Sequence, residues 1–196
     1  MTGHEAARDG AGRAAQSGQP RRSPYQMRLL ATGAEQAEAR ALIEDRTRWL
    51  AERNLPAIPA AAALPAGEPG VNAIGIFDDD ELVGCLALHP RPGGLSVTRA
   101  YGRPGADFAR LATLWASDYA ARCAMKGVRT VVVCPRTGPF AARHRLETHL
   151  TGLGWSVVSH NSESARLQLA AEARPLLTAL IHCAVPLPQA PLRSTP

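Results

Sequence analysis

The hydrophobic pattern of this sequence changes its period twice between residues 95 and 134, and that change constrains the fold most. Residues 95–100 have the composition of a strand. From Phe108 to Cys123 apolar side chains recur every three or four residues, which predicts an amphipathic helix that ends at Gly127. The β-branched run 130–134 predicts a central strand that is buried on both faces. A helix therefore connects two strands, which predicts an α/β fold class.

A predicted hairpin precedes this unit. The strand-like runs 71–77 and 82–88 flank the acidic segment 78–81, an arrangement typical of a hairpin with an acidic turn. A second turn at 90–94 leads into the strand at 95–100, so the three strands form a meander. We interpret the acidic segment as a solvated turn rather than as a catalytic or metal-binding cluster.

A capping box marks the start of a helix nearer the N-terminus. Residues 26–31 are strand-like, and Thr32 is followed three residues later by Glu35. At this spacing the two side chains satisfy each other's backbone amides. We expect the helix to stop at Asn54, and residues 55–70, rich in Ala and Pro, leave room for one short helix.

The last third of the sequence predicts another helix and at least two strands. Thr137 and Pro139 form a typical helix start. The helix continues to Gly154 with a buried stripe of Leu146, Leu150 and Leu153. Strands are predicted at 155–159 and 165–169. The apolar run at 176–185 fits either a helix or a strand.

Length and charge narrow the class of protein. The chain has 196 residues, 45% of them hydrophobic, which suffices for one domain. We predict a disordered basic tail at 1–24, a domain at 25–185 and a Pro-rich tail at 186–196. The formal charge is +5, but the basic residues are scattered and Lys126 is the only lysine, which argues against nucleic acid as a partner.

Compartment and metal binding can also be predicted. The sequence has no apolar segment typical of a secretory signal or a membrane span, so we expect a cytoplasmic protein with no membrane partner. Its four cysteines form no C-x-x-C pair and have no nearby histidine at metal-ligand spacing. We therefore expect reduced thiols and no metal site. A homodimer is left open.

The order of these elements and two local motifs resemble a known family. The block 101–110 resembles a strand end followed by a basic, Gly-rich loop, and it leads into the helix of residues 111–122. Gly154-Trp155 resembles a Gly-aromatic step. Both motifs are similar to those of the GNAT (GCN5-related N-acetyltransferase) fold family, here in a divergent, actinobacterial-type form covering roughly residues 27–172.

This resemblance implies a fold and an activity. The implied fold is a mixed central sheet of about six to seven strands flanked by about four helices. The implied activity is that of an acyl-CoA-dependent N-acyltransferase, which passes an acyl group directly from acetyl-CoA or another acyl-CoA to a small-molecule amine.

The resemblance also assigns coenzyme A binding to the Gly-rich loop. The family pattern is Gln or Arg, two residues, Gly, one residue, then Gly or Ala, so that Pro104 and Asp107 replace the basic residue and the central glycine. An aspartate there repels phosphate, although it suits a helix N-cap. The implied cofactor-binding residues are Arg103, Gly105, Ala106, Asp107, Phe108, Ala109 and Arg110, together with Val97, Thr98 and Arg99, whose backbone polarises the acyl oxygen.

The family's proton donor, a tyrosine on the last helix, is missing. Its position is Leu150, and the neighbouring His149 is the implied catalytic acid, because imidazole titrates near neutral pH. One residue on a helix, however, is about 100° around the axis. His89 and His160, at strand ends, are candidate bases. The alternative is a GNAT-fold protein with lost or altered chemistry, either a non-acetylating biosynthetic enzyme or a ligand-binding protein.

Overall fold

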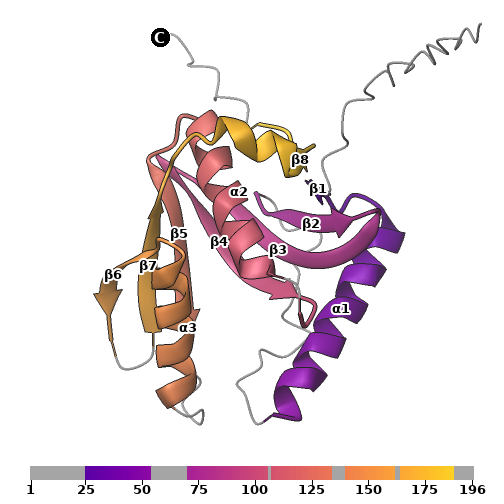
Figure 1. Ribbon diagram of the computed structural model, residues 1–196, viewed down its shortest axis with the longest axis horizontal. Helices are drawn as coiled ribbons and strands as arrows, with labels where there is room; N and C mark the ends of the chain where they lie inside the picture. Colours follow the sequence, from indigo (N-terminus) through magenta and orange to yellow (C-terminus); the bar gives the residue numbers. More distant parts are fainter. Residues whose placement is uncertain (1–24, 54–69, 106, 134–139, 162–163, 188–196) are drawn as a thin grey trace, which may run out of the picture.

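A computed structural model describes residues 25–53, 70–105, 107–133, 140–161 and 164–187. One eight-stranded sheet, in the order β6-β7-β5-β4-β3-β2-β1-β8, runs through it (Figure 1). β4 pairs with β5 and β1 with β8 in parallel, and the other neighbours are antiparallel. The strands are β1 (Tyr25–Leu29), β2 (Asn72–Asp78), β3 (Glu81–Arg91), β4 (Gly94–Gly102), β5 (Gly127–Val133), β6 (Ser156–His160), β7 (Ser164–Ala170) and β8 (Ile181–Cys183).

Helices cover the two faces of the sheet unequally. α2 (Phe108–Arg122) and the carboxyl end of α3 (Phe140–Gly152) pack on one face, over the larger core. α1 (Gly33–Ala51) packs on the opposite face, against β3 and β4. A short 3-10 helix, η2 (Pro175–Ala179), precedes β8. One face of β5, β7 and β6 therefore carries no helix among the residues that the structure describes.

The capping box forms as the sequence predicts. Thr32 Oγ1 accepts a hydrogen bond from the Glu35 amide at 3.2 Å, and a Glu35 carboxylate oxygen accepts from the Thr32 amide at 3.0 Å. The hydrogen bond from the Thr32 amide to the carboxylate is the main cause that lowers the pKa of Glu35. The helix ends at Ala51, close to the expected stop at Asn54.

The predicted acidic hairpin is also confirmed. Asp78 pairs with Glu81, and the two central residues, Asp79 and Asp80, have φ angles of 45° and 68°. Two consecutive positive φ values are the mark of a type I′ turn, whose twist matches that of the flanking strands. Aspartate tolerates this conformation better than most residues, so these acids have a structural role at this turn.

The fold class is confirmed, and the described residues show how the sheet reaches eight strands. The apolar run 176–185, left open between helix and strand, forms both η2 and β8, and β8 adds a strand beside β1. The described residues contain three α-helices and the 3-10 helix, in agreement with about four helices.

Two local predictions were wrong. α2 ends at Arg122 rather than at Gly127, because Ala124 takes a positive φ of 54° and Met125 donates its amide to the Ala120 carbonyl. Gly127 instead begins β5, where a Cβ atom would lie 2.6 Å from the Leu169 carbonyl oxygen on β7. β5 is not buried on both faces either, since Val131 is 46% exposed on the face without a helix.

A third prediction holds in part, and several lie outside the described residues. In α3, Leu150 and Leu153 pack against the core, whereas Leu146 is exposed. The short helix at 55–70, the helix start at 137–139 and the basic tail at 1–24 lie outside the described residues, apart from residue 70. So does the predicted Pro-rich tail, except for Pro186 and Leu187.

Candidate active site

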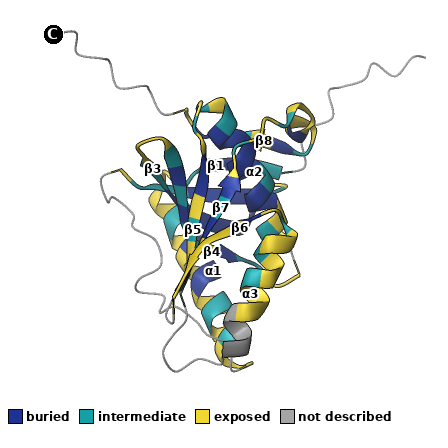
Figure 2. Cartoon of the chain, turned by 90° about the vertical axis from the view of Figure 1, so that its left-hand side faces the viewer, coloured by how far each residue is buried: buried dark blue, intermediate teal, exposed yellow. Residues whose placement is uncertain are grey.

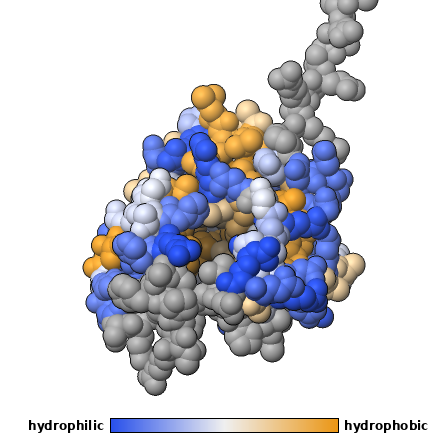
Figure 3. Space-filling view, turned by 60° about the horizontal axis from the view of Figure 1, so that its bottom comes forward, coloured by the Kyte–Doolittle hydropathy of each residue, from blue (hydrophilic) through white to orange (hydrophobic). Residues whose placement is uncertain are grey.

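β4 and β5 diverge after a short parallel contact. They pair at Leu95–Val128 and Ser96–Arg129, near the start of both strands. β4 continues to Gly102 and β5 to Val133, and no further pairing between them is present in the described residues. The β4 backbone from Val97 onward is therefore open toward the gap. Figure 3 shows a hollow with an apolar floor and hydrophilic rims on the side of the molecule at which these strands end.

A β-bulge on β4 lies beside this gap. Thr98 pairs with Ala87 and Tyr101 with Cys85, so two residues, Arg99 and Ala100, oppose one residue of β3. Arg99 has a φ of 51°, an uncommon conformation for a residue with a side chain. Because one extra residue reverses the alternation of side chains, the bulge turns Tyr101 toward α1. It also bends the strand edge that faces β5.

The loop after β4 ends in the N-terminus of α2. Gly105 has a φ of 89°, and Asp107 is the N-cap residue. The first amide with a helical partner is that of Leu111, which donates to the Asp107 carbonyl. The amides of Phe108, Ala109 and Arg110 precede it and have no partner within the helix. Together with the positive end of the helix dipole they favour an anion at this position.

Two glycines fix the position of this helix start. A Cβ atom on Gly84 would lie 2.1 Å from the Phe108 ring, and one on Gly102 would lie 2.4 Å from the Phe108 Cβ. The two glycines are Cα partners on β3 and β4. Phe108 therefore lies directly against the sheet and is buried. Its side chain is an anchor, so only its amide can face an anion.

The charged residues of the loop lie in different environments. Arg103 forms an ion pair with Glu81 of the acidic hairpin, and its amide donates to the Val83 carbonyl at 2.9 Å. Asp107 and Arg110 are exposed. The Asp107 side chain makes no capping hydrogen bond, so its carboxylate does not serve the N-cap role that the sequence allowed. Ala106 lies outside the described residues.

The histidines predicted as acids or bases do not converge. His89 Nε2 lies 2.9 Å from Thr98 Oγ1, on the α1 side of the sheet beside the start of the gap. His149 is exposed on α3, while Leu150 packs against the core. His160 Nε2 lies 3.6 Å from a Glu147 carboxylate oxygen, at the end of β6. His89 is thus the histidine that the register places beside the gap.

The Gly-aromatic step connects α3 to α2. Gly154 has a φ of 97°, and the Trp155 amide donates to the Leu150 carbonyl at 3.1 Å. Trp155 is buried, and its indole nitrogen donates to Thr113 Oγ1 at 3.0 Å. The motif therefore sets the position of the α3 carboxyl end relative to α2.

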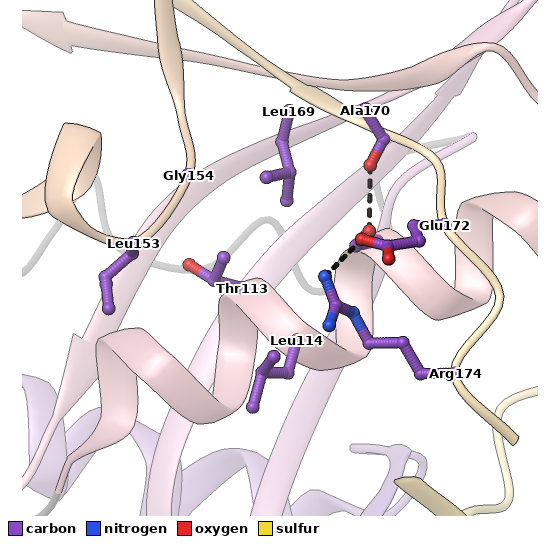
Figure 4. Close-up of a pocket in the computed structure, with 9 residues that line it drawn as sticks. Thr113, Leu114, Leu153, Gly154, Leu169, Ala170, Glu172 and Arg174 are labelled. Carbon is purple, nitrogen blue, oxygen red and sulfur yellow. Dashed lines mark hydrogen bonds and ion pairs between the residues drawn. The ribbon is translucent and has the colours of Figure 1, made fainter. Parts of the chain in front are cut away.

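A separate pocket lies on the flank of α2 (Figure 4). Its volume is about 130 Å³, and its lining includes Thr113, Ser117, Leu153 and Arg174. Arg174 pairs with Glu172 at the edge. Pockets for drug-sized ligands measure about 300–1,000 Å³, so this one is too small for a coenzyme.

The described residues restrict other kinds of site. They contain no group of three or more His, Cys, Asp or Glu side chains that could hold a metal ion. None of their helices is long and apolar enough to cross a membrane. Burial raises the pKa of the Cys85 thiol to about 12, and burial is also the main cause of the raised pKa of Tyr101. Neither group is an activated nucleophile or base.

Comparison with solved structures identifies the architecture. FeeM, an N-acyl amino acid synthase from uncultured soil microbes, superposes with a TM-score of 0.53 at 14% identity over 75% of this chain and 91% of that chain. The aminoglycoside 6'-N-acetyltransferase of Enterococcus faecium superposes with a TM-score of 0.53 at 14% identity, over 77% of this chain and 98% of that chain. An acyl-CoA N-acyltransferase from Pseudomonas aeruginosa superposes with a TM-score of 0.52 at 14% identity, over 74% of this chain and 98% of that chain.

This chain has the GNAT fold. No family model matches the sequence, and a search of curated proteins finds no match. The GNAT architecture predicted from the order of the elements and the two motifs is therefore confirmed by structure alone. The β4–β5 gap and the N-terminus of α2 together form the candidate site, because β4 leads directly into the loop before α2.

The sequence did not reveal two parts of this site. Gly84 gave no signal, because its role depends on a ring 24 positions later in the chain. The bulge at Arg99 and Ala100 gave none either, since an arginine is not typical of the positive φ that Arg99 has.

Proposed function

We propose that this protein is an N-acyltransferase that uses acetyl-CoA or another acyl-CoA and a small amine. The observation that carries the proposal is the juxtaposition of the β4–β5 gap, the β4 bulge and the N-terminus of α2. An open strand edge and an anion site placed end to end fit a long ligand that has a phosphorylated half and an amide-containing half. We propose a cytoplasmic location, with which the unpaired thiols of Cys85, Cys123 and Cys183 agree.

The anion site would hold the phosphates. The amides of Phe108, Ala109 and Arg110, which have no partner within the helix, point out of α2, and Gly105 gives the loop a positive φ in open space. We assign phosphate binding to residues 103 and 105–110, as the resemblance implies. Arg103 would have to leave Glu81 to contribute its charge, whereas Arg110 is already exposed.

The open edge of β4 would hold the acyl end. An acyl-CoA supplies a thioester, whose carbonyl carbon forms a bond to the amine nitrogen as its bond to sulfur breaks. The backbone of Val97, Thr98 and Arg99 lies on the edge that faces the gap and can donate to the acyl oxygen.

Two proton transfers remain to be assigned. The amine loses a proton as the new bond forms, and the departing sulfur gains one. We propose His89, oriented by Thr98, as the base, because it lies beside the start of the gap. His149 is the proposed acid, as the resemblance implies, and its side chain is exposed on α3.

Calorimetric titration with coenzyme A and acetyl-CoA tests the proposal. We expect saturable binding, and about tenfold weaker binding for Gly105→Ala, since a Cβ disfavours the positive φ of the loop. Gly93→Ala is the matched control, because Gly93 also has a positive φ and open space but lies in the β3–β4 turn. If millimolar coenzyme A produces no heat and no thermal shift, the proposal is wrong.

A second candidate is a GNAT-fold protein with altered chemistry. The exposed Asp107 carboxylate at the α2 N-terminus and the core packing of Leu150 favour it. It predicts coenzyme A binding without release of the thiol in the presence of a broad amine panel. Release of coenzyme A that depends on the amine excludes it.

A further inference from the structure

The sheet face that α1 leaves uncovered carries two exposed arginines. Val128 and Val132 of β5 point into the core under α2, and so do Ala165, Leu167 and Leu169 of β7. Because side chains alternate along a strand, Arg129 and Arg166 point to the opposite face, the face on which α1 lies. Both are exposed, and the described part of the chain places no helix over them.

The strand register brings these arginines together. Arg129 is the Cα partner of Gln168, and Val131 is the Cα partner of Arg166. Arg129 and Arg166 are therefore diagonal neighbours on one face, with Cβ atoms roughly 7 Å apart. Val131, 46% exposed, is on the same face, directly opposite Arg166 and two residues from Arg129. We call Arg129, Val131, Arg166 and Gln168 the arginine face.

The charges on this face are unbalanced. Neither arginine forms an ion pair within the described residues. The described residues of β5, β6 and β7 include no Asp or Glu at all. Two positive charges this close repel each other, and two guanidinium groups at this spacing can together bind a carboxylate.

The arginine face adjoins the proposed acyl site. Arg129 is the partner of Ser96, the last residue of β4 to pair with β5 before the strands diverge. Ser96 is in turn the partner of His89, so the register row runs His89, Ser96, Arg129, Gln168. Two strand spacings, about 10 Å, separate the His89 and Arg129 backbones. Long side chains can bridge that distance.

We infer that Arg129 and Arg166 select the acceptor by binding its carboxylate. The acceptor class is then an amino acid-like amine, which places its carboxylate between the guanidinium groups, its aliphatic part over Val131 and its amine toward the gap. Polycationic amines are repelled by the same charges. The inference rests on the proposed function for the position of the amine.

The first test compares acceptors that differ only in charge. Release of coenzyme A from acetyl-CoA is measured with the twenty standard amino acids, their carboxamides and spermidine. For each amino acid that the protein acetylates, we expect kcat/KM to be at least tenfold higher than for its carboxamide. Spermidine should have the lowest kcat/KM. Arg129→Gln and Arg166→Gln should each raise KM for the acid and bring the ratio toward one, leaving the amide unchanged.

Arg40→Gln is the matched control, because Arg40 is exposed on α1 and the substitution removes the same charge. Its acid-to-amide ratio should equal that of the wild type. Equal rates for acids and amides in the wild type, or an equal loss for both in the arginine variants, would overturn the inference.

A binding measurement separates this inference from the proposed function. N-acetyl amino acids and their carboxamides are titrated calorimetrically into the protein without coenzyme A, so no turnover is needed. At least tenfold tighter binding of the acids, lost in Arg129→Gln and Arg166→Gln, supports the arginine face even if coenzyme A does not bind. Acids that bind no better than amides contradict it even if coenzyme A binds well.

Discussion

At the scale of residues, the anion site depends on two positions that have no side chain. Gly84 and Gly102 leave a flat surface on the sheet, and Phe108 lies on it. The first turn of α2 therefore has a fixed height above β3 and β4. The amides that have no partner within the helix are held in place by packing, without any hydrogen bond from the Asp107 side chain.

Gly84→Ala should destabilise the protein by about 1–3 kcal/mol, the usual cost of overpacking. The added methyl group would overlap the Phe108 ring, which lies 2.1 Å from that Cβ position. Urea unfolding measures the loss. In a Phe108→Ala background the same substitution should cost much less, and an unchanged cost would show that the ring is not the obstacle. Gly33→Ala, with no atom within 4 Å, is the control.

Cys85 should make stability fall at alkaline pH. Burial raises its pKa from 9.0 to about 12, so above pH 9 the unfolded chain loses a proton that the folded protein keeps. Its contribution is complete below pH 9 and is lost as pH rises toward 12. At pH 10.5 the loss is roughly 2 kcal/mol. Between pH 8 and pH 10.5 the free energy of unfolding should fall less for Cys85→Ala than for the wild type. An equal fall in the two proteins would contradict this prediction.

At the scale of elements, α2 connects the site to the end of the chain. Its N-terminus rests on β3 and β4, and its second half holds the segment after β7. Asp118 is buried and accepts hydrogen bonds from the Arg174 amide and from Arg122 Nε, both at 2.8 Å. The Tyr119 hydroxyl donates to the Pro186 carbonyl, and Ser117 donates to the Ala170 carbonyl.

Asp118→Ala should release this segment without unfolding the sheet. Losing the acceptor leaves the Arg174 amide without its partner and should cost about 1–3 kcal/mol. Hydrogen exchange of residues 172–187 should accelerate, while β3 and β4 keep their protection. Asp45→Ala removes an exposed carboxylate paired with Arg48 and should change neither region. Faster exchange throughout the sheet would mean that the segment has no separate stability.

Asp107→Ala should tighten coenzyme A binding two- to fivefold. An exposed carboxylate at a helix N-terminus is worth about 0.3–1 kcal/mol, and here it competes with a phosphate for the same amides. Calorimetry at low ionic strength measures the effect, which added salt should reduce. Weaker binding would instead mean that Asp107 orients the loop.

At the scale of the molecule, the sheet has two different halves. β2 and β3 are buried along most of their length, whereas the described helices contact β5 and β7 on the α2 side only and every residue of β6 is exposed (Figure 2). The two halves meet where β4 and β5 diverge. A ligand in the gap would therefore have the anion site at one end and the arginine face beside the other.

The sequence predicted what depends on local pattern. The strand-helix-strand unit, the capping box at Thr32 and the acidic hairpin each follow from a few neighbouring residues, and each is confirmed. The sequence failed where distant segments decide. Gly127 resembles a helix stop, but its small size serves the contact with Leu169. Val131 resembles a buried residue, but no described helix covers it.

The roles of the site residues also depend on segments that are distant in the sequence, and they stay predictions. The loop proposed to bind phosphate departs from the GNAT pattern at Pro104 and Asp107, yet the backbone amides that it presents do not depend on side chains. The arginine face could not be foreseen, because the pairing of Arg129 with Gln168 and of Val131 with Arg166 is a property of strand register.

Amide hydrogen exchange with and without coenzyme A is the most direct test of the proposed site, because it locates the ligand as well as detecting it. Coenzyme A bound as proposed should slow exchange at residues 97–99 of β4 and at 105–110, with no change in β1, β2 or the exposed turns of α1. Unchanged exchange in both segments, or protection confined to another part of the molecule, would contradict it.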